Sequence, residues 1–159
     1  MRETIRVWII VTFSILVWVL QFNLITDIKA SRYLKEEVEI ALHDAGLQLD
    51  EYALAQGDVI YHQQRAYDAF VNSLEKNTKL NYLEPSALSF YEDSFEVVVF
   101  DILDESNTRF PVEYEHPDYF LSRIYEGPTI IAVVETYGPR YFNGVKQKIR
   151  RGASYTYYH

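Results

Sequence analysis

The feature that most constrains this chain is a long apolar run near its N-terminal end. No charged residue interrupts Val7 to Thr26, and the core of this stretch, VWIIVTFSILVWVL, has only Thr12 and Ser14 as polar side chains. At a rise of about 1.5 Å per residue, a helix of this length spans about 30 Å, which is the thickness of the hydrocarbon core of a bilayer. The run therefore predicts a transmembrane helix.

We expect this helix to be an uncleaved anchor. A cleaved secretory signal ends at a small-residue site of the A-x-A type, but the apolar run leads instead into Gln21, Asn23, Asp27 and Lys29. The only nearby small residues are the pair Ala30-Ser31, which lacks that pattern. The sequence after the run thus favours retention of the helix in the membrane.

The orientation of the helix needs a separate argument, because cations flank the run on both sides and the positive-inside comparison does not decide. The chain after the run is acidic, rich in tyrosine and free of cysteine, which suits an exported domain. We expect residues 1–6 to be a cytoplasmic stub, residues 7–26 to cross the cell membrane once, and residues 27–159 to lie outside. A cytoplasmic domain on a reversed anchor is the alternative. The flanking cations are Arg2, Arg6, Lys29, Arg32 and Lys35.

The helical pattern continues beyond the apolar run. Apolar residues recur at three- and four-residue steps, and no Pro or Gly interrupts the chain before Gly46. This predicts one continuous helix from about Ile5 to Ala45, about 60 Å long, with Gly46 as its C-cap. The apolar stripe of its second half consists of Leu34, Val38, Ala41, Leu42, Ala45 and Leu49.

The rest of the chain predicts one more helix and then strands. An apolar face indicates a helix from about Gln63 to Lys76, preceded by a break at Gly57-Asp58. After Pro85 the period changes to two, which predicts strands at residues 95–101, 129–135 and 153–158. The predicted fold class is α+β: a single N-terminal transmembrane helix that continues into an amphipathic helix, a second helix, and a small antiparallel sheet of three to five strands.

Catalytic and metal-binding chemistry finds little support. The chain has no cysteine, its four histidines have no metal-ligand spacing, and it has no G-x-S-x-G, P-loop or G-x-G-x-x-G motif. We therefore expect no enzyme, no catalytic residue, no metal site and no cofactor. Two acidic groups could hold a hard cation, but solvated turns between strands are the simpler interpretation. They are Asp101, Asp104 and Glu105, and Glu113, Glu115 and Asp118 beside His116.

The charge is unevenly distributed along the chain. Fifteen Lys and Arg against twenty-three Asp and Glu give a net charge of −8, which argues against nucleic acid as a partner. The segment from Arg140 to His159 nevertheless has five cations and no acid. We predict that this segment is an assembly surface that contacts the acidic face of another copy. Contact with anionic lipid or wall polymer, and pairing within its own domain, are the alternatives. The five cations are Arg140, Lys146, Lys148, Arg150 and Arg151.

Two further features bear on possible contacts. In lipid, polar side chains favour a partner helix, so Ser14 and Gln21, which lie on nearly one helical face, together with Asn23, are candidate assembly residues. For Gln21 and Asn23 the alternative is contact with water near the interface. Fourteen tyrosines could form a binding surface, although packing in the core and sheet is the simpler interpretation.

The build of the chain resembles the lollipop shape of type IV pilins and pseudopilins. More narrowly, residues 1–85 are similar to TadE-like pilus proteins of Gram-positive tight-adherence systems through three segments: MRETIRVWIIV, ALHDAGLQLDEYALAQGDVIY and AYDAFVNSLEKNTKLNYLEP. The resemblance covers about half the chain. No Gly-Phe prepilin cleavage site precedes the apolar run, and no Glu lies within it.

The resemblance implies a structural subunit of a pilus or secretion machine at the cell surface, with other copies or related subunits as partners and with lipid around its first helix. It brings no catalytic residue to this chain. The alternative is an anchored accessory or sensor domain that binds a protein or wall-polymer partner. The two hypotheses differ in whether the chain assembles with itself through its first helix.

Overall fold

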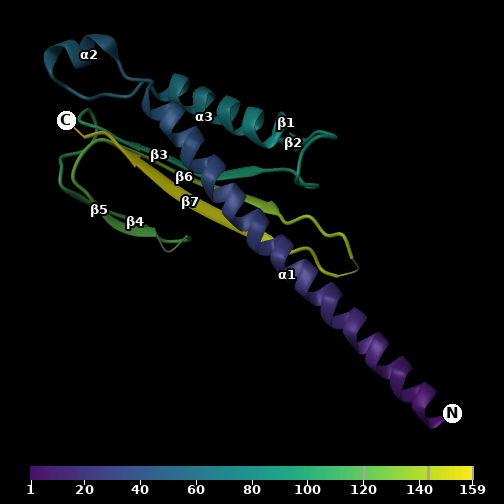
Figure 1. The fold of residues 1–159 in the computed structure, drawn as a ribbon. Coiled ribbons are helices and arrows are strands. Elements are labelled where there is room, and N and C mark those ends of the chain that lie inside the picture. Colours follow the sequence, from purple (N-terminus) through teal and green to yellow (C-terminus); the bar gives the residue numbers. More distant parts are fainter. Residues whose placement is uncertain (120, 143, 159) are drawn as a thin grey trace.

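A computed structural model describes residues 1–119, 121–142 and 144–158. Its first element, α1 (Arg2–Gly46), is one unbroken helix of 45 residues. The first half projects away from the rest of the protein as a bare rod, and the second half lies along a small head (Figure 1). The α+β class predicted from the sequence is confirmed, and so is the continuity of the long helix.

Among the described residues, α1 is the only helix long and apolar enough to span a membrane. In its most apolar window, 6% of the residues are buried, whereas the core helix of a water-soluble domain is mostly buried. The exposed side chains there are large and apolar, including Trp8, Phe13, Leu16 and Trp18. Such a surface needs an apolar environment because water cannot solvate it favourably.

The head is built on the second half of α1. The predicted stripe is buried as far as Ala45, with Leu34, Val38 and Ala41 fully inaccessible to solvent. Leu49 lies beyond the end of the helix, where it is half-buried and forms a bridge with Tyr61. It packs against α3 (Gln63–Thr78), which contributes Phe70 and Leu74 to the same core. The predicted pairing of these two helices is therefore present.

Gly46 does not have the expected role of a C-cap. It is the last residue of α1, and Leu47 caps the helix in a right-handed conformation with φ −81°. A Cβ atom on Gly46 would lie 2.3 Å from the ring of Tyr155, so the glycine permits close packing of helix and sheet. The left-handed cap is found instead at Gly57, with φ 96°, where it ends the short helix α2 (Glu51–Gln56), which the sequence did not predict.

The main sheet has three antiparallel strands in the order β3 (Glu96–Leu103), β6 (Thr129–Tyr137) and β7 (Lys148–Thr156). The first eight residues of β6 are buried, which fits a central strand covered on both faces. β7 begins five residues before the predicted start at Ala153. Two further strands, β1 (Leu80–Asn81) and β2 (Glu84–Pro85), form a separate small hairpin.

Another hairpin, β4 (Val112–His116) and β5 (Leu121–Tyr125), covers the sheet face opposite the helices (Figure 1). The expectation of a solvated turn around Glu113, Glu115 and His116 was wrong. These residues lie in β4, where the side chains of Val112 and Tyr114 are half-buried and the two glutamates are exposed. Short edge strands often carry charge on their outer face, so acidity did not exclude a strand.

Candidate membrane-facing and assembly surface

The predicted assembly residues of the apolar helix do not share one environment. Ser14 is exposed, and its hydroxyl donates to the carbonyl of Ile10 at 2.8 Å within the helix. Gln21 is exposed as well. Asn23 is half-buried, and its Oδ1 has no hydrogen-bond partner among the described residues. The free side of the apolar helix therefore carries Ser14 and Gln21, and Asn23 is partly covered.

The loop between β6 and β7 extends beside the apolar helix (Figure 1). The ring of Phe142 lies 5.9 Å from that of Trp18 and 5.4 Å from that of Phe22, and Tyr141 lies 5.8 Å from Phe22, each measured between ring centroids. These contacts are edge-on, which is a favoured geometry for aromatic pairs. The head thus reaches back along the helix into the predicted transmembrane segment.

Arg140 joins this loop to the helix. Its guanidinium donates to the carboxylate of Asp27 at 3.0 Å, and it also donates twice to the carbonyl of Val145, at 3.1 and 2.8 Å. The Arg140 side chain is only 12% exposed. Because one cation bonds both the helix and the far side of the loop, it fixes the loop against α1.

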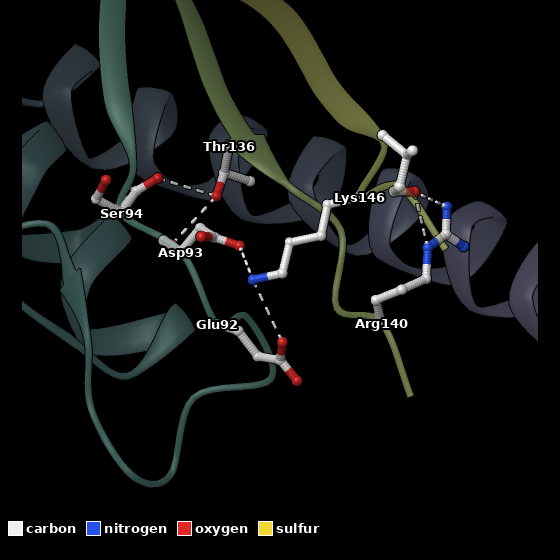
Figure 2. Close-up of polar contacts among 7 residues, drawn as sticks. Glu92, Asp93, Ser94, Thr136, Arg140 and Lys146 are labelled. Atoms are coloured by element: carbon white, nitrogen blue, oxygen red, sulfur yellow. Dashed lines mark hydrogen bonds and ion pairs between the residues drawn. The ribbon is translucent and has the colours of Figure 1, made fainter. Parts of the chain in front are cut away.

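Lys146 ties the other side of the loop to the head. Figure 2 shows its ammonium between Asp93, at 2.5 Å, and Glu92, at 3.5 Å. Thr136, at the end of β6, donates to the carbonyls of Asp93 and Ser94. The hydrogen bonds that Lys146 donates to Asp93 and Glu92 raise its pKa, so the ammonium form is favoured. Strand end, loop and the segment before β3 are therefore held together.

The remaining cations of the basic segment also have partners in the same chain. Lys148 and Arg150 both bond Glu135, whose side chain is only 4% exposed, and Arg150 lies over the ring of Tyr119. Burial raises the pKa of Glu135, but the hydrogen bonds from the two cations outweigh it and lower the pKa below the ordinary value. Arg151 donates to Ser31 of α1. Pairing within the domain was one of the open alternatives, and a contact between copies stays a prediction.

The two acidic groups are not arranged as cation sites. Among the described residues, no three His, Cys, Asp or Glu side chains come together in a way that could hold a metal ion. Asp104 is 1% exposed and accepts from the backbone N–H of Tyr61 at 3.1 Å, and Glu105 accepts from Val59 at 2.5 Å. The expected solvated turn was wrong for Asp101, which lies within β3, and for Asp104, whose carboxylate accepts from the backbone N–H groups of Tyr61, before α3, and of Ser106.

The histidines are dispersed. His43 packs against Tyr155 and His116 against Tyr119, with centroids 5.4 and 4.9 Å apart, and His62 precedes α3. His159 lies outside the described residues.

A buried acid on α1 is a feature that the sequence analysis missed. Glu37 is 8% exposed, and its Oε2 has no hydrogen-bond partner among the described residues. Burial raises the pKa of Glu37, Glu36 adds to this effect, and hydrogen bonds from Tyr33 and Asn77 partly offset it. Glu37 lies three residues after Leu34 and four before Ala41, so the helical period places it beside the apolar stripe, whereas the exposed Glu36 and Glu39 lie on the other side of the helix.

Comparison with protein-family models, with curated proteins and with solved structures found no match to this chain.

Proposed function

We propose that this chain is a single-pass, membrane-anchored structural subunit of a pilus or secretion-type assembly, with its head on the outer side of the cell membrane. The observation that carries the proposal is the division of α1: an exposed apolar half and a half buried in the head form one continuous helix. A helix of this kind can fix a head at a membrane and also pack against neighbouring subunits. The resemblance of residues 1–85 to TadE-like pilus proteins supports the same function.

The free side of the apolar helix is the surface that we propose for contact between subunits. Ser14 and Gln21 are seven residues apart, so at about 100° per residue they differ by only about 20° around the helix axis. Both are exposed. In a bilayer, hydrogen bonds between helices contribute about 0.6 to 2 kcal/mol each, and small polar residues allow close approach.

Disulfide cross-linking in membranes tests this surface, because the chain has no cysteine of its own. The variants Ser14→Cys and Gln21→Cys are each expressed as full chains and oxidised in the membrane. We expect covalent dimers from both. Leu16→Cys is the matched control, because Leu16 is also exposed but lies about 200° from Ser14 around the helix. Monomers at all three positions would contradict assembly through this helix.

An anchored binding domain is the second candidate function. The observation in its favour is a shallow depression of about 530 Å³ next to the C-terminal residues, which lie at the opposite end of the head from the apolar rod (Figure 1). Tyrosine and arginine are enriched at binding surfaces, and Tyr158 is 76% exposed. The residues that line the depression are Arg123, Ser154, Tyr155, Thr156, Tyr157 and Tyr158. Monomers in the cross-linking experiment would favour this function.

A further inference from the structure

The described residues of the β6–β7 loop, 138–142 and 144–147, include contacts with α1 from which a depth can be calculated. Phe142 contacts Trp18 and Phe22, which lie eight and four residues before Thr26, the last residue of the uncharged run. At about 1.5 Å per residue, the contacts lie about 12 and about 6 Å inside the end of that run. The ring of Phe142 is therefore at the level of the apolar segment rather than above it.

If the bilayer ended at the level of Trp18, so that the loop stayed outside it, the remaining apolar part of the helix would be too short to cross it. From Val7 to Trp18 there are only twelve residues, which span about 18 Å, whereas the hydrocarbon core is about 30 Å thick. If α1 spans the membrane through its uncharged run, the tip of the loop must enter the leaflet on the side of the head. A depth of 5 to 10 Å is typical of elements that lie in the interface between headgroups and acyl chains.

The side chains of the loop suit that interface. Tyr141 is 56% exposed and Val145 is 88% exposed, and Phe142 of the same loop contacts the exposed ring of Trp18. Tyr and Trp are enriched at the two membrane interfaces because their rings are apolar and their polar atoms can reach water. Exposing this group of apolar side chains on one small loop to water would be unfavourable.

Two polar groups of the loop, the Arg140 guanidinium and the Val145 carbonyl, are paired, which favours a shallow insertion. Arg140 is neutralised by Asp27 and donates two hydrogen bonds to the Val145 carbonyl. An irregular backbone is unfavourable in lipid unless its polar groups are paired, so this closed contact lowers the cost of insertion. The charge of Lys146 is paired as well, with Asp93 and Glu92 of the head (Figure 2).

We propose that the β6–β7 loop is a second membrane-binding element, which inserts Tyr141, Phe142 and Val145 into the lipid interface on the side of the head. The proposal rests on the membrane anchoring of α1 under the proposed function. Together, helix and loop give two points of attachment, so the head has a fixed height and tilt above the bilayer. Lipid is the favoured occupant because large apolar side chains of α1, including Trp18 and Leu20, are exposed at that depth beside the loop.

Depth-dependent fluorescence quenching tests this proposal. The full chain is labelled at a single cysteine with an environment-sensitive fluorophore and reconstituted in vesicles of phosphatidylcholine and phosphatidylglycerol that contain doxyl-labelled lipid. Three variants are compared. Val145→Cys reports on the loop and Leu16→Cys on the helix. Tyr52→Cys is the water-facing control, because Tyr52 is 77% exposed in α2, at the end of the head away from the apolar rod (Figure 1). We expect a blue shift and strong quenching at positions 16 and 145, with position 145 quenched best by doxyl groups near the headgroup, and no quenching at position 52.

The other possible outcomes distinguish the loop proposal from the membrane anchoring of α1. Quenching at position 16 without quenching at position 145 would overturn the loop proposal and leave the anchor intact. No quenching at position 16 would contradict the anchor itself. A blue shift at position 145 that appears only at high protein-to-lipid ratio, without lipid quenching, would mean that the loop binds a second copy, and this would also overturn the proposal.

Discussion

Val38 lies at the centre of the contact between α1 and the rest of the head. It is fully buried, with Leu34, Ala41 and Leu42 of the same stripe beside it on the helix. An aspartate here would bury an unpaired charge, so Val38→Asp is expected to destabilise the head by several kcal/mol, about 3 or more. Thermal unfolding of the full chain in detergent micelles measures the effect.

Ile40→Asp is the matched control for this substitution, because Ile40 lies two residues further along α1 and is 49% exposed. It is expected to change the free energy of unfolding by less than about 0.5 kcal/mol. Equal, small effects at both positions would mean that the helix is a free stalk and does not pack in the head.

Gly46 allows α1 to approach Tyr155 of β7 more closely than any other residue could. A methyl group there would overlap the ring, so Gly46→Ala is expected to cost about 1 to 3 kcal/mol. The clash has one partner, which makes a double-mutant cycle informative. Adding Tyr155→Ala should remove most of the cost of Gly46→Ala, and strictly additive effects would refute the close contact.

At the scale of elements, Glu135 links the central strand to the edge strand through Lys148 and Arg150. Its pKa lies below the ordinary value of 4.5, so this contact contributes full stability above that pH. The contribution is lost as the pH falls through the lowered pKa, because the carboxylate takes up a proton. We expect Glu135→Gln to lower the melting temperature at neutral pH. The difference from the parent protein should shrink as the pH falls through the lowered pKa, because the carboxylate of the parent protein is then protonated as well.

Glu113→Gln, which changes an exposed acid on β4, is the control for Glu135→Gln and should follow the parent protein at every pH. Melting temperatures measured across the acidic range decide the matter. A constant difference between Glu135→Gln and the parent protein down to the lowest pH would contradict the role assigned to the carboxylate.

The sequence predicted long, regular elements and missed short or locally mixed ones. The helix over Arg2–Gly46, α3 and the apolar strands β3 and β6 follow clear periods. The first half of β7 reads KIRRG, and β4 reads VEYEH, so charge and glycine obscured two strands whose places depend on pairing with distant partners. Helix α2 is only six residues long, which is too short to produce a period.

The candidate surface was less predictable than the fold. The polar residues of the apolar run could be identified directly, but the loop could not. Tyr141 and Phe142 lie between Gly138-Pro139 and Gly144, in a segment without period, and their contacts on α1 lie more than 100 residues away in the sequence. Nothing in one sequence indicates a contact over such a separation.

At the scale of the whole molecule, the cations of the basic C-terminal segment pair with acids of the same chain and so stabilise the head. Changing Lys146, Lys148, Arg150 and Arg151 together to Glu would place new acids beside Asp93 and Glu135. We expect this quadruple variant to unfold the head, as seen by circular dichroism of the full chain in micelles. A folded quadruple variant that has lost a salt-sensitive self-association would instead assign these cations to contacts between copies.

We propose that one helix serves both membrane and head, and hydrogen exchange of the full chain in phospholipid vesicles tests this claim. Amides of residues 7–26 are expected to be protected by lipid and to exchange faster when the protein is moved into mild detergent with looser packing. Amides of residues 30–45 should stay protected in both, because the head covers them. Rapid exchange of residues 7–26 in vesicles, with residues 30–45 still protected, would show that the apolar half lies outside the bilayer and would contradict the claim.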